Sequence, residues 1–246
     1  MTTLLLFDID GTLVLTGGAG GRAMTRAFDE IFSIPNGFHG ISMAGRTDAW
    51  ILADAAAAHG ISPDSPELAR FPEIYLPHLA REIQEPASSN VVKAVMPGIP
   101  ELLESLSALC RTGDVFLALL TGNYEAAARL KLEYFDLWRY FSCGAFGDGA
   151  LDRNVLLPKA IRRVTTVSGL DVRANDTILI GDTPLDIACA VAGGARSIAV
   201  ATGSFTRDQL REAGADVTFR DLSQTSEVLA QIALLARGTD VATPTP

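Results

Sequence analysis

Short, uninterrupted apolar runs recur along the chain and alternate with longer segments of helical character. Such runs are typical of strands that are buried on both faces of a parallel sheet. The runs cover residues 4–7, 115–120, 177–180, 197–200 and, more weakly, 217–219. Segments with helical character open at Pro97, Asn154 and Pro184, between these runs. The alternation predicts a doubly wound α/β fold, with a Rossmann-like core around a parallel sheet.

The chain between the first strand and about residue 92 breaks this rhythm, because it carries helical patterns but no convincing strand. The helical patterns span residues 20–31, 48–59 and 66–85, separated by turn-rich pieces at 33–40 and 60–66. We therefore expect an all-helical cap domain at residues 16–91, inserted into a core made of residues 1–15 and 92–237. The tail at residues 238–246 is rich in Thr and Pro, and we expect it to be disordered.

The first candidate site residues come directly after the first apolar run, in the segment Asp8-Ile9-Asp10-Gly11-Thr12. A carboxylate can act as a covalent nucleophile toward phosphorus. A neighbouring acid can protonate the leaving oxygen and later deprotonate water. Asp8 and Asp10 are therefore candidate catalytic residues, and the turn at Gly11 and Thr12 is a candidate substrate contact.

A second candidate group stands at the end of the run 115–120, where Thr121 is followed by Gly122 and Asn123. A hydroxyl and free backbone amides at a strand-to-helix turn suit the oxygens of a phosphate. Open α/β sheets bind their ligands at the carboxyl ends of the strands. We therefore expect these three residues to lie near Asp8 and to bind substrate.

A third group, Gly181-Asp182-Thr183-Pro184-Leu185-Asp186, follows the run 177–180. Asp182 and Asp186 are four residues apart across a helix start, so both can face the same side. Together with Asp8 they form an oxygen-rich site suited to Mg²⁺, which takes a few carboxylates and keeps several waters. The metal would offset the repulsion between a phosphate dianion and an anionic nucleophile.

These motifs, in this order, resemble the haloacid dehalogenase-like hydrolase superfamily, specifically its branch with a helical cap after the first motif. The resemblance rests on DxDGT after an apolar strand, then hhhTGN and hhhGDTxxD, and it spans residues 4–235. It implies a nucleophile, an acid/base, a phosphate-binding residue and two Mg²⁺ ligands at Asp8, Asp10, Thr121, Asp182 and Asp186. It also implies that the backbone carbonyl of Asp10 reaches the metal.

The cationic motif of the family is where this sequence departs from the pattern. The family usually carries a Lys at the start of the helix that precedes the GD strand. Here Arg153 occupies the helix start, whereas Lys159 is the usual residue type but lies well inside the helix. Six residues apart on a 3.6-residue helix, their side chains point to different faces. We favour Arg153 as the catalytic cation, because Arg stays protonated and binds phosphate as a fork; Lys159 remains the alternative.

The segment Gly45-Arg46-Thr47-Asp48 lies within the expected cap. Similar Gly-containing turns in capped relatives reach down into the active site and contact the substrate. Arg46 is therefore a candidate contact for a substrate anion. The alternative is that Arg46 and Asp48 only begin a helix.

The charge pattern narrows the range of partners. The formal net charge is −9, and the Lys and Arg residues are scattered, which argues against binding to nucleic acid or to an anionic membrane. The apolar run at residues 4–7 is too short for a signal peptide or a membrane span. We expect a cytoplasmic protein whose partner is a small phosphorylated substrate, and we leave open whether it is a monomer or a homodimer.

The function we expect is that of a Mg²⁺-dependent phosphomonoester hydrolase with an aspartyl-phosphate intermediate, and the resemblance implies a substrate like 2-phosphoglycolate. A sugar-phosphate phosphomutase of the same fold would use the same catalytic residues and is the main alternative. Dehalogenases of this fold need neither a leaving-group acid nor Mg²⁺, so Asp10, Asp182 and Asp186 count against that activity. A non-catalytic phosphate sensor ranks lowest, since only the irregular cationic motif supports it.

Overall fold

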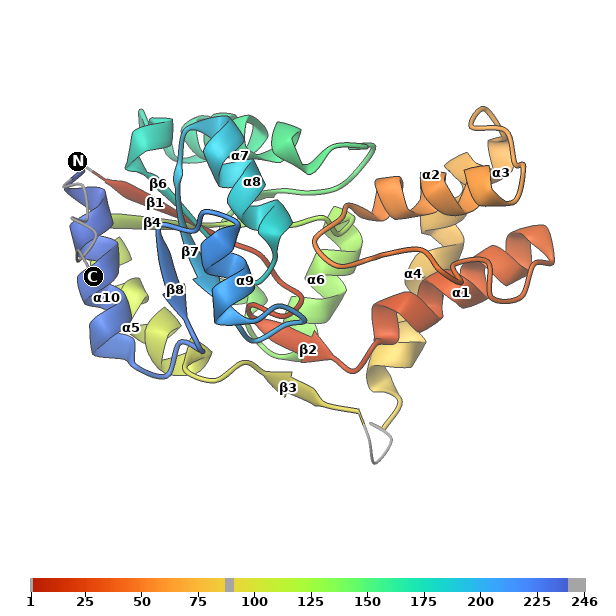
Figure 1. Ribbon diagram of the computed structural model, residues 1–246, viewed down its shortest axis with the longest axis horizontal. Coiled ribbons are helices and arrows are strands. Elements are labelled where there is room, and N and C mark those ends of the chain that lie inside the picture. Colours follow the sequence, from red (N-terminus) through yellow and green to blue (C-terminus); the bar gives the residue numbers. More distant parts are fainter. Residues whose placement is uncertain (1, 87–90, 239–246) are drawn as a thin grey trace.

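A six-stranded parallel sheet forms the centre of the computed structural model, which describes residues 2–86 and 91–238 (Figure 1). The strand order is β5-β4-β1-β6-β7-β8, and each neighbouring pair is parallel. The strands are β1 Thr3–Phe7, β4 Val115–Leu120, β5 Gly144–Ala145, β6 Thr177–Gly181, β7 Arg196–Val200 and β8 Val217–Phe219. The predicted α/β fold with a parallel sheet is confirmed. The two-residue strand β5 has no apolar run and was not predicted.

Helices cover both faces of the sheet. They are α5 Ile99–Thr112, α6 Glu125–Tyr134, α7 Leu156–Ser168, α8 Pro184–Gly193, α9 Arg207–Glu212 and α10 Thr225–Ala236, with short 3-10 turns η1 Trp138–Tyr140, η2 Arg153–Val155 and η3 Ala174–Asp176. In β1, Leu5 and Phe7 belong to the apolar cluster that includes residues of α5, α6 and α10, whereas Leu4 and Leu6 belong to the cluster of α7 and α8. Alternate strand residues point to opposite faces. Both faces are thus apolar, and β1 is a continuous apolar run.

Along the sequence, a helical insert follows β1 and precedes all the other strands of the six-stranded sheet. The chain leaves through β2 Val14–Thr16 and returns through β3 Lys93–Val95, and these two strands pair antiparallel. Between them lie the helices α1 Ala19–Phe32, α2 Asp48–Ala58, α3 Pro66–Ala69 and α4 Phe71–Gln84. The insert lies at one end of the sheet, at the right of Figure 1. Its division from the core at residues 15/16 and 91/92 stays a prediction, and residues 239–246 of the expected tail lie outside the described residues.

The insert has an apolar core of its own, which includes Phe28, Phe71, Tyr75 and Leu79. Side chains of this size contribute roughly 1.5–3 kcal/mol each when fully buried. Tyr124 and Ala127, at the start of α6, join the same cluster, so α6 connects the insert to the sheet.

The predicted single helix at residues 66–85 is wrong in one respect, because the structure breaks it at Arg70 into α3 and α4. Pro72 lies in the first turn of α4. It has no backbone N–H, so it cannot donate the hydrogen bond to Leu68 that would join the two helices. No helix among the described residues has the length and apolar character needed to span a bilayer.

Candidate active site

Asp8 and Asp10 extend β1 beyond the carboxyl edge of the sheet. The backbone N–H of Asp8 donates to the carbonyl of Ile180 in β6 at 2.9 Å, which keeps the first carboxylate beside the end of that strand. Gly11 then turns the chain with φ 84°, and a Cβ at this position would lie 2.4 Å from Oδ2 of Asp182. Only glycine accepts both this backbone angle and this close approach.

Three buried carboxylates meet at this edge. Asp8, Asp182 and Asp186 each place one carboxylate oxygen within 4.8 Å of the others. Asp186 is fixed by the capping box of α8, in which its Oδ2 accepts from the backbone N–H of Thr183 at 3.0 Å and from the Thr183 hydroxyl at 2.7 Å. This arrangement satisfies free N–H groups at the start of α8 and orients Asp186 at the same time.

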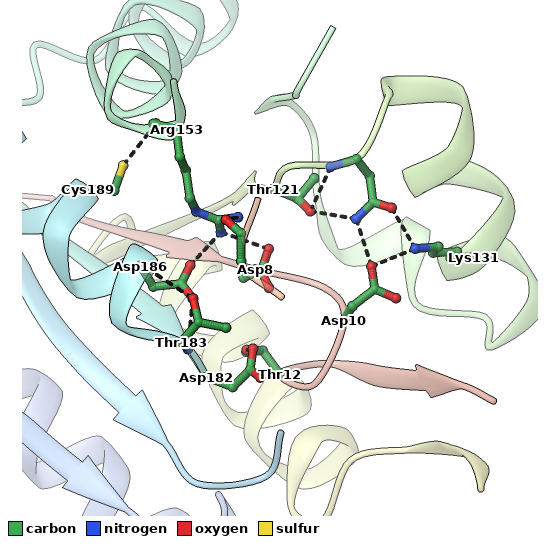
Figure 2. Close-up of polar contacts among 12 residues, drawn as sticks. Asp8, Asp10, Thr12, Thr121, Lys131, Arg153, Asp182, Thr183, Asp186 and Cys189 are labelled. Carbon is green, nitrogen blue, oxygen red and sulfur yellow. Dashed lines mark hydrogen bonds and ion pairs between the residues drawn. The ribbon is translucent and has the colours of Figure 1, made fainter. Parts of the chain in front are cut away.

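Arg153 is the cation at this cluster (Figure 2). Its Nη2 donates to Oδ1 of Asp8 at 3.0 Å and also to Oδ1 of Asp186. Its Nη1 donates to the backbone carbonyl of Gly45, in the helical insert, at 2.9 Å. The Arg153 side chain is 2% exposed, so the cation and both carboxylates interact with little screening by water.

The cluster holds more negative charge than one guanidinium balances. Burial, together with the charges of Asp8 and Asp186, raises the pKa of Asp182 to about 9. Burial likewise raises the pKa of Asp8 to about 6, although Arg153 opposes this shift. A set of buried carboxylate oxygens with unbalanced negative charge is the donor set that a hard divalent cation prefers. The residues present therefore fit a divalent metal.

A second polar group lies beside the carboxylates and consists of Asp10, Thr121, Asn123 and Lys131 (Figure 2). Lys131 Nζ donates to Oδ2 of Asp10 and to Oδ1 of Asn123, both at 2.6 Å. Asn123 Nδ2 donates to the same Asp10 oxygen at 2.9 Å and to the hydroxyl of Thr121 at 2.8 Å. The group links the ends of β1 and β4 to helix α6.

A cavity of about 560 Å³ lies over both groups, between the sheet edge and the helical insert. The sheet edge contributes Asp8, Asp10, Gly11, Thr121, Gly122, Asn123, Lys131, Arg153 and Asp182 to its wall, and the insert contributes Met24, Met43, Gly45, Arg46, Asp48, Ile51 and Tyr75. Polar and charged groups thus converge on one side, opposite a wall that is largely apolar. This is the usual constitution of a small-molecule site.

The loop before α2 holds the insert against the core. The backbone N–H of Asp48 donates to the carbonyl of Gly122 at 2.7 Å, and the Asp48 carboxylate accepts from the backbone N–H of Tyr124 at 2.9 Å. A Cβ at Gly122 would lie 2.1 Å from the backbone oxygen of Arg46. Gly122 is therefore required for this docking, in addition to lining the cavity.

Comparisons with known proteins agree with this geometry. A family model described as haloacid dehalogenase-like hydrolase matches residues 5–190. The chain belongs to the haloacid dehalogenase-like hydrolase family.

Relatives and solved structures of this family cover almost the whole chain. A phosphoglycolate phosphatase of Rhodospirillum rubrum is 28% identical over 93% of this chain and 91% of its own length. Phosphoglycolate phosphatase 1 of Pseudomonas aeruginosa is 29% identical over 94% of this chain and 82% of its own length. The crystal structure of a predicted phosphatase from Clostridium acetobutylicum has a TM-score of 0.67 at 20% identity and covers 94% of this chain and 99% of that one. These relatives are named as phosphatases, which confirms the expected enzyme class.

Not every residue predicted for the site of this haloacid dehalogenase-like hydrolase lies at the cavity. Lys159 is exposed on α7 and does not line the cavity, so the structure brings Arg153 and not Lys159 to the carboxylates, and the choice of Arg153 as the catalytic cation stays a prediction. Six residues separate it from Arg153, which turns it to another face of the helix. Thr12 is buried and donates to Oδ1 of Asp182 at 3.3 Å. It therefore supports a carboxylate and does not line the cavity, and its predicted contact with substrate stays a prediction.

Arg46 lies where both of the roles considered for it are possible. It lies at the cavity wall, two residues before α2, whose N-cap is Thr47. Its guanidinium forms an ion pair with Asp54 and stacks 4.0 Å from the centroid of the Trp50 ring. In this structure its charge is balanced within the insert, so a direct contact with substrate stays a prediction.

Lys131 is the residue that sequence reasoning missed. It lies on α6 among the buried positions Ala127, Ala128 and Leu132, where a charged residue is rare unless paired. A helical pattern at residues 125–134 would have placed this Lys on the buried face and marked it as a candidate. The family motif stops at Asn123 and gave no reason to look further.

Proposed function

We propose that this protein is a Mg²⁺-dependent phosphatase that hydrolyses a small phosphomonoester through an aspartyl-phosphate on Asp8. The observation that carries the proposal is the cluster of Asp8, Asp182 and Asp186, bridged by the buried Arg153 and open to a cavity beside Asp10. A nucleophilic carboxylate, an acid/base and a fixed positive charge are the groups that phosphoryl transfer to an aspartate needs.

In the first half of the reaction, a carboxylate oxygen of Asp8 attacks phosphorus, and the bond between phosphorus and the ester oxygen breaks. Asp10 gives its proton to the departing alkoxide oxygen, which leaves as an alcohol. Arg153 is held between Asp8 and Asp186, so its charge is in place before the substrate arrives. Such prearranged charge stabilises the developing negative charge on the phosphoryl oxygens.

In the second half, the Asp10 carboxylate takes a proton from water, and the water oxygen attacks phosphorus of the aspartyl-phosphate. The bond between phosphorus and Asp8 breaks, which releases inorganic phosphate, restores the Asp8 carboxylate and leaves Asp10 protonated for the next cycle. Mg²⁺ held by Asp8, Asp182, Asp186 and the backbone carbonyl of Asp10 would offset the repulsion between the phosphate dianion and this acidic cluster. The hydroxyl of Thr121, at the cavity wall, is positioned to donate to a phosphoryl oxygen.

A small substrate such as 2-phosphoglycolate accords with the names of the curated relatives. The helical insert contributes Met24, Met43 and Tyr75 to the wall of the same cavity. We place the reaction in the cytoplasm, on a soluble phosphorylated metabolite, in accord with the charge pattern.

Phosphate release from a panel of small phosphomonoesters, with Mg²⁺ and with a chelator, tests the proposal. We expect release that depends on Mg²⁺ and is lost in Asp8→Asn. The panel includes sugar phosphates, and their products are analysed for movement of the phosphoryl group within the sugar. Isomerised sugar phosphate in place of inorganic phosphate would identify a phosphomutase instead.

A further inference from the structure

Lys131 is an almost fully buried cation that lies outside the family motifs. Its side chain is 5% exposed, and its Nζ lies 2.6 Å from both Asp10 Oδ2 and Asn123 Oδ1. Burying an ammonium group costs several kcal/mol unless it is paired and hydrogen-bonded. The partners of Lys131 therefore matter to the fold, and one of them is the expected acid/base.

Asn123 and Lys131 both bind the same oxygen of Asp10. Its Nδ2 donates to Asp10 Oδ2 at 2.9 Å, so this oxygen accepts from both Asn123 and Lys131. Neither of these bonds ends on Oδ1. The Thr121 hydroxyl accepts the second hydrogen of Asn123 Nδ2 at 2.8 Å, which fixes the amide in turn.

The terminal torsion of an Asp side chain is broad when nothing holds it. Two donors on one oxygen restrict this torsion and fix the plane of the Asp10 carboxyl group. A carboxyl oxygen that accepts two hydrogen bonds has no room for a proton, so the proton that is transferred belongs on Oδ1. Asp10 lines the cavity and its side chain is 44% exposed, which leaves Oδ1 accessible to a substrate.

We propose that Lys131 is a positioning residue that orients Asp10, so that its Oδ1 delivers a proton to the leaving oxygen of the substrate. This proposal rests on the proposed phosphatase function, in which Asp10 is the acid. Lys131 then acts through Asp10 and needs no contact with the substrate. Misorienting a catalytic group by a small angle is enough to lose a large part of its contribution.

The dependence of the rate on the leaving group separates this role from a structural one. An alkyl phosphomonoester such as 2-phosphoglycolate needs a proton on its leaving oxygen, whereas p-nitrophenyl phosphate releases a stable phenolate without one. The value of kcat/KM reports only the steps up to release of the alcohol or phenolate. We expect Lys131→Met to lower kcat/KM about tenfold or more for alkyl esters and less than about threefold for p-nitrophenyl phosphate.

Three further variants sharpen the comparison. Arg129→Met removes an exposed cation from the same helix, paired with Glu133, and is expected to change neither rate. Lys131→Arg keeps a charged donor, so its two kcat/KM values are expected to stay closer to those of the wild type. This variant keeps the proposal testable if Lys131→Met folds poorly. Asp10→Asn removes the acid, so adding Lys131→Met to it should not change the ratio of the two rates further.

Equal losses on both esters, or a further change of the ratio in the double variant, would overturn the role of Lys131 while the phosphatase function stands. A wild-type protein that releases phosphate from no ester overturns the phosphatase function and this proposal with it. The two failures are therefore distinct in the same experiment.

Discussion

Arg153 Nη2 lies 3.0 Å from Asp8 Oδ1, and both side chains are more than nine-tenths buried. An ion pair in this setting is weakly screened and fixes the orientation of both partners. The pair connects η2, which precedes helix α7, to the end of β1. It places a permanent positive charge directly beside the candidate nucleophile.

We expect Arg153→Met to lower kcat/KM for phosphomonoesters by about 10²–10³-fold, the usual effect of removing one group that stabilises transition-state charge. Removing one partner of a buried pair also costs about 3–5 kcal/mol of stability, so unfolding by urea is measured beside the kinetics. Lys159→Met serves as the matched control, because Lys159 is exposed on α7. A comparable loss of activity in Lys159→Met would mean that Arg153 is not the catalytic cation.

Binding of a divalent metal is expected to release about one proton per ion near neutral pH. The reason is that burial raises the pKa of Asp182 to about 9, so the metal-free cluster holds a proton at pH 7.5 that the ion displaces. Calorimetric titration with Mg²⁺ in two buffers of different ionisation enthalpy measures this proton. An apparent enthalpy that is the same in both buffers would refute the prediction, and Asp182→Asn should abolish both the binding and the proton release.

Asp48 is expected to make the protein less stable as the pH rises from about 4 to 7. Burial raises the pKa of this carboxyl group from 3.8 to about 7, against the pull of Lys131. Below pH 4 the folded and unfolded states are both protonated, and the group has no effect. Between pH 4 and 7 only the folded state holds the proton, so unfolding is increasingly favoured as the pH rises.

Asp48→Asn removes this titration and keeps an oxygen that can accept from the backbone N–H of Tyr124. As the pH rises from 4 to 8, we expect the free energy of unfolding of Asp48→Asn to increase relative to that of the wild type by on the order of 1–3 kcal/mol. Urea unfolding at both pH values, with a chelator present, measures the difference. Asp64→Asn, at an exposed position of the same insert, is the control, and an equal response of both variants would contradict the assignment to Asp48.

The parts of the fold that the sequence predicted are those with strong local signals. Strand β4 is buried on both faces, so its apolar run gave its bounds correctly at 115–120. Strands β2, β3 and β5 are only two or three residues long, which leaves little periodicity to detect, although the weak apolar run of the equally short β8 did predict that strand. Strands β2 and β3 pair where the chain enters and leaves the insert, and β5 pairs with β4 at the edge of the sheet. These strands therefore depend on tertiary contacts and not on a local pattern.

The candidate site divides in the same way. Asp8, Thr121 and Asp182 stand next to apolar strands, so strand positions alone were enough to bring them together. The sequence left Arg153 and Lys159 open, because the phase of helix α7 relative to the sheet decides which one points inward. The helical pattern at residues 125–134 could have marked Lys131 as buried, but its pairing with Asp10 across 121 positions of sequence is one that no local pattern reveals.

The measurement that tests the central claim most directly is the trapping of a phosphoryl group on Asp8. Asp10→Asn lacks the base that activates water, but p-nitrophenolate leaves without an acid, so this variant should accumulate the aspartyl-phosphate. Rapid quenching of Asp10→Asn with p-nitrophenyl phosphate and Mg²⁺, followed by mass spectrometry of the peptides, locates the group. The account predicts one phosphoryl group on Asp8 and none in the Asp8→Asn, Asp10→Asn double variant; phosphate release by the wild type with the group on another residue, or on none, would contradict it.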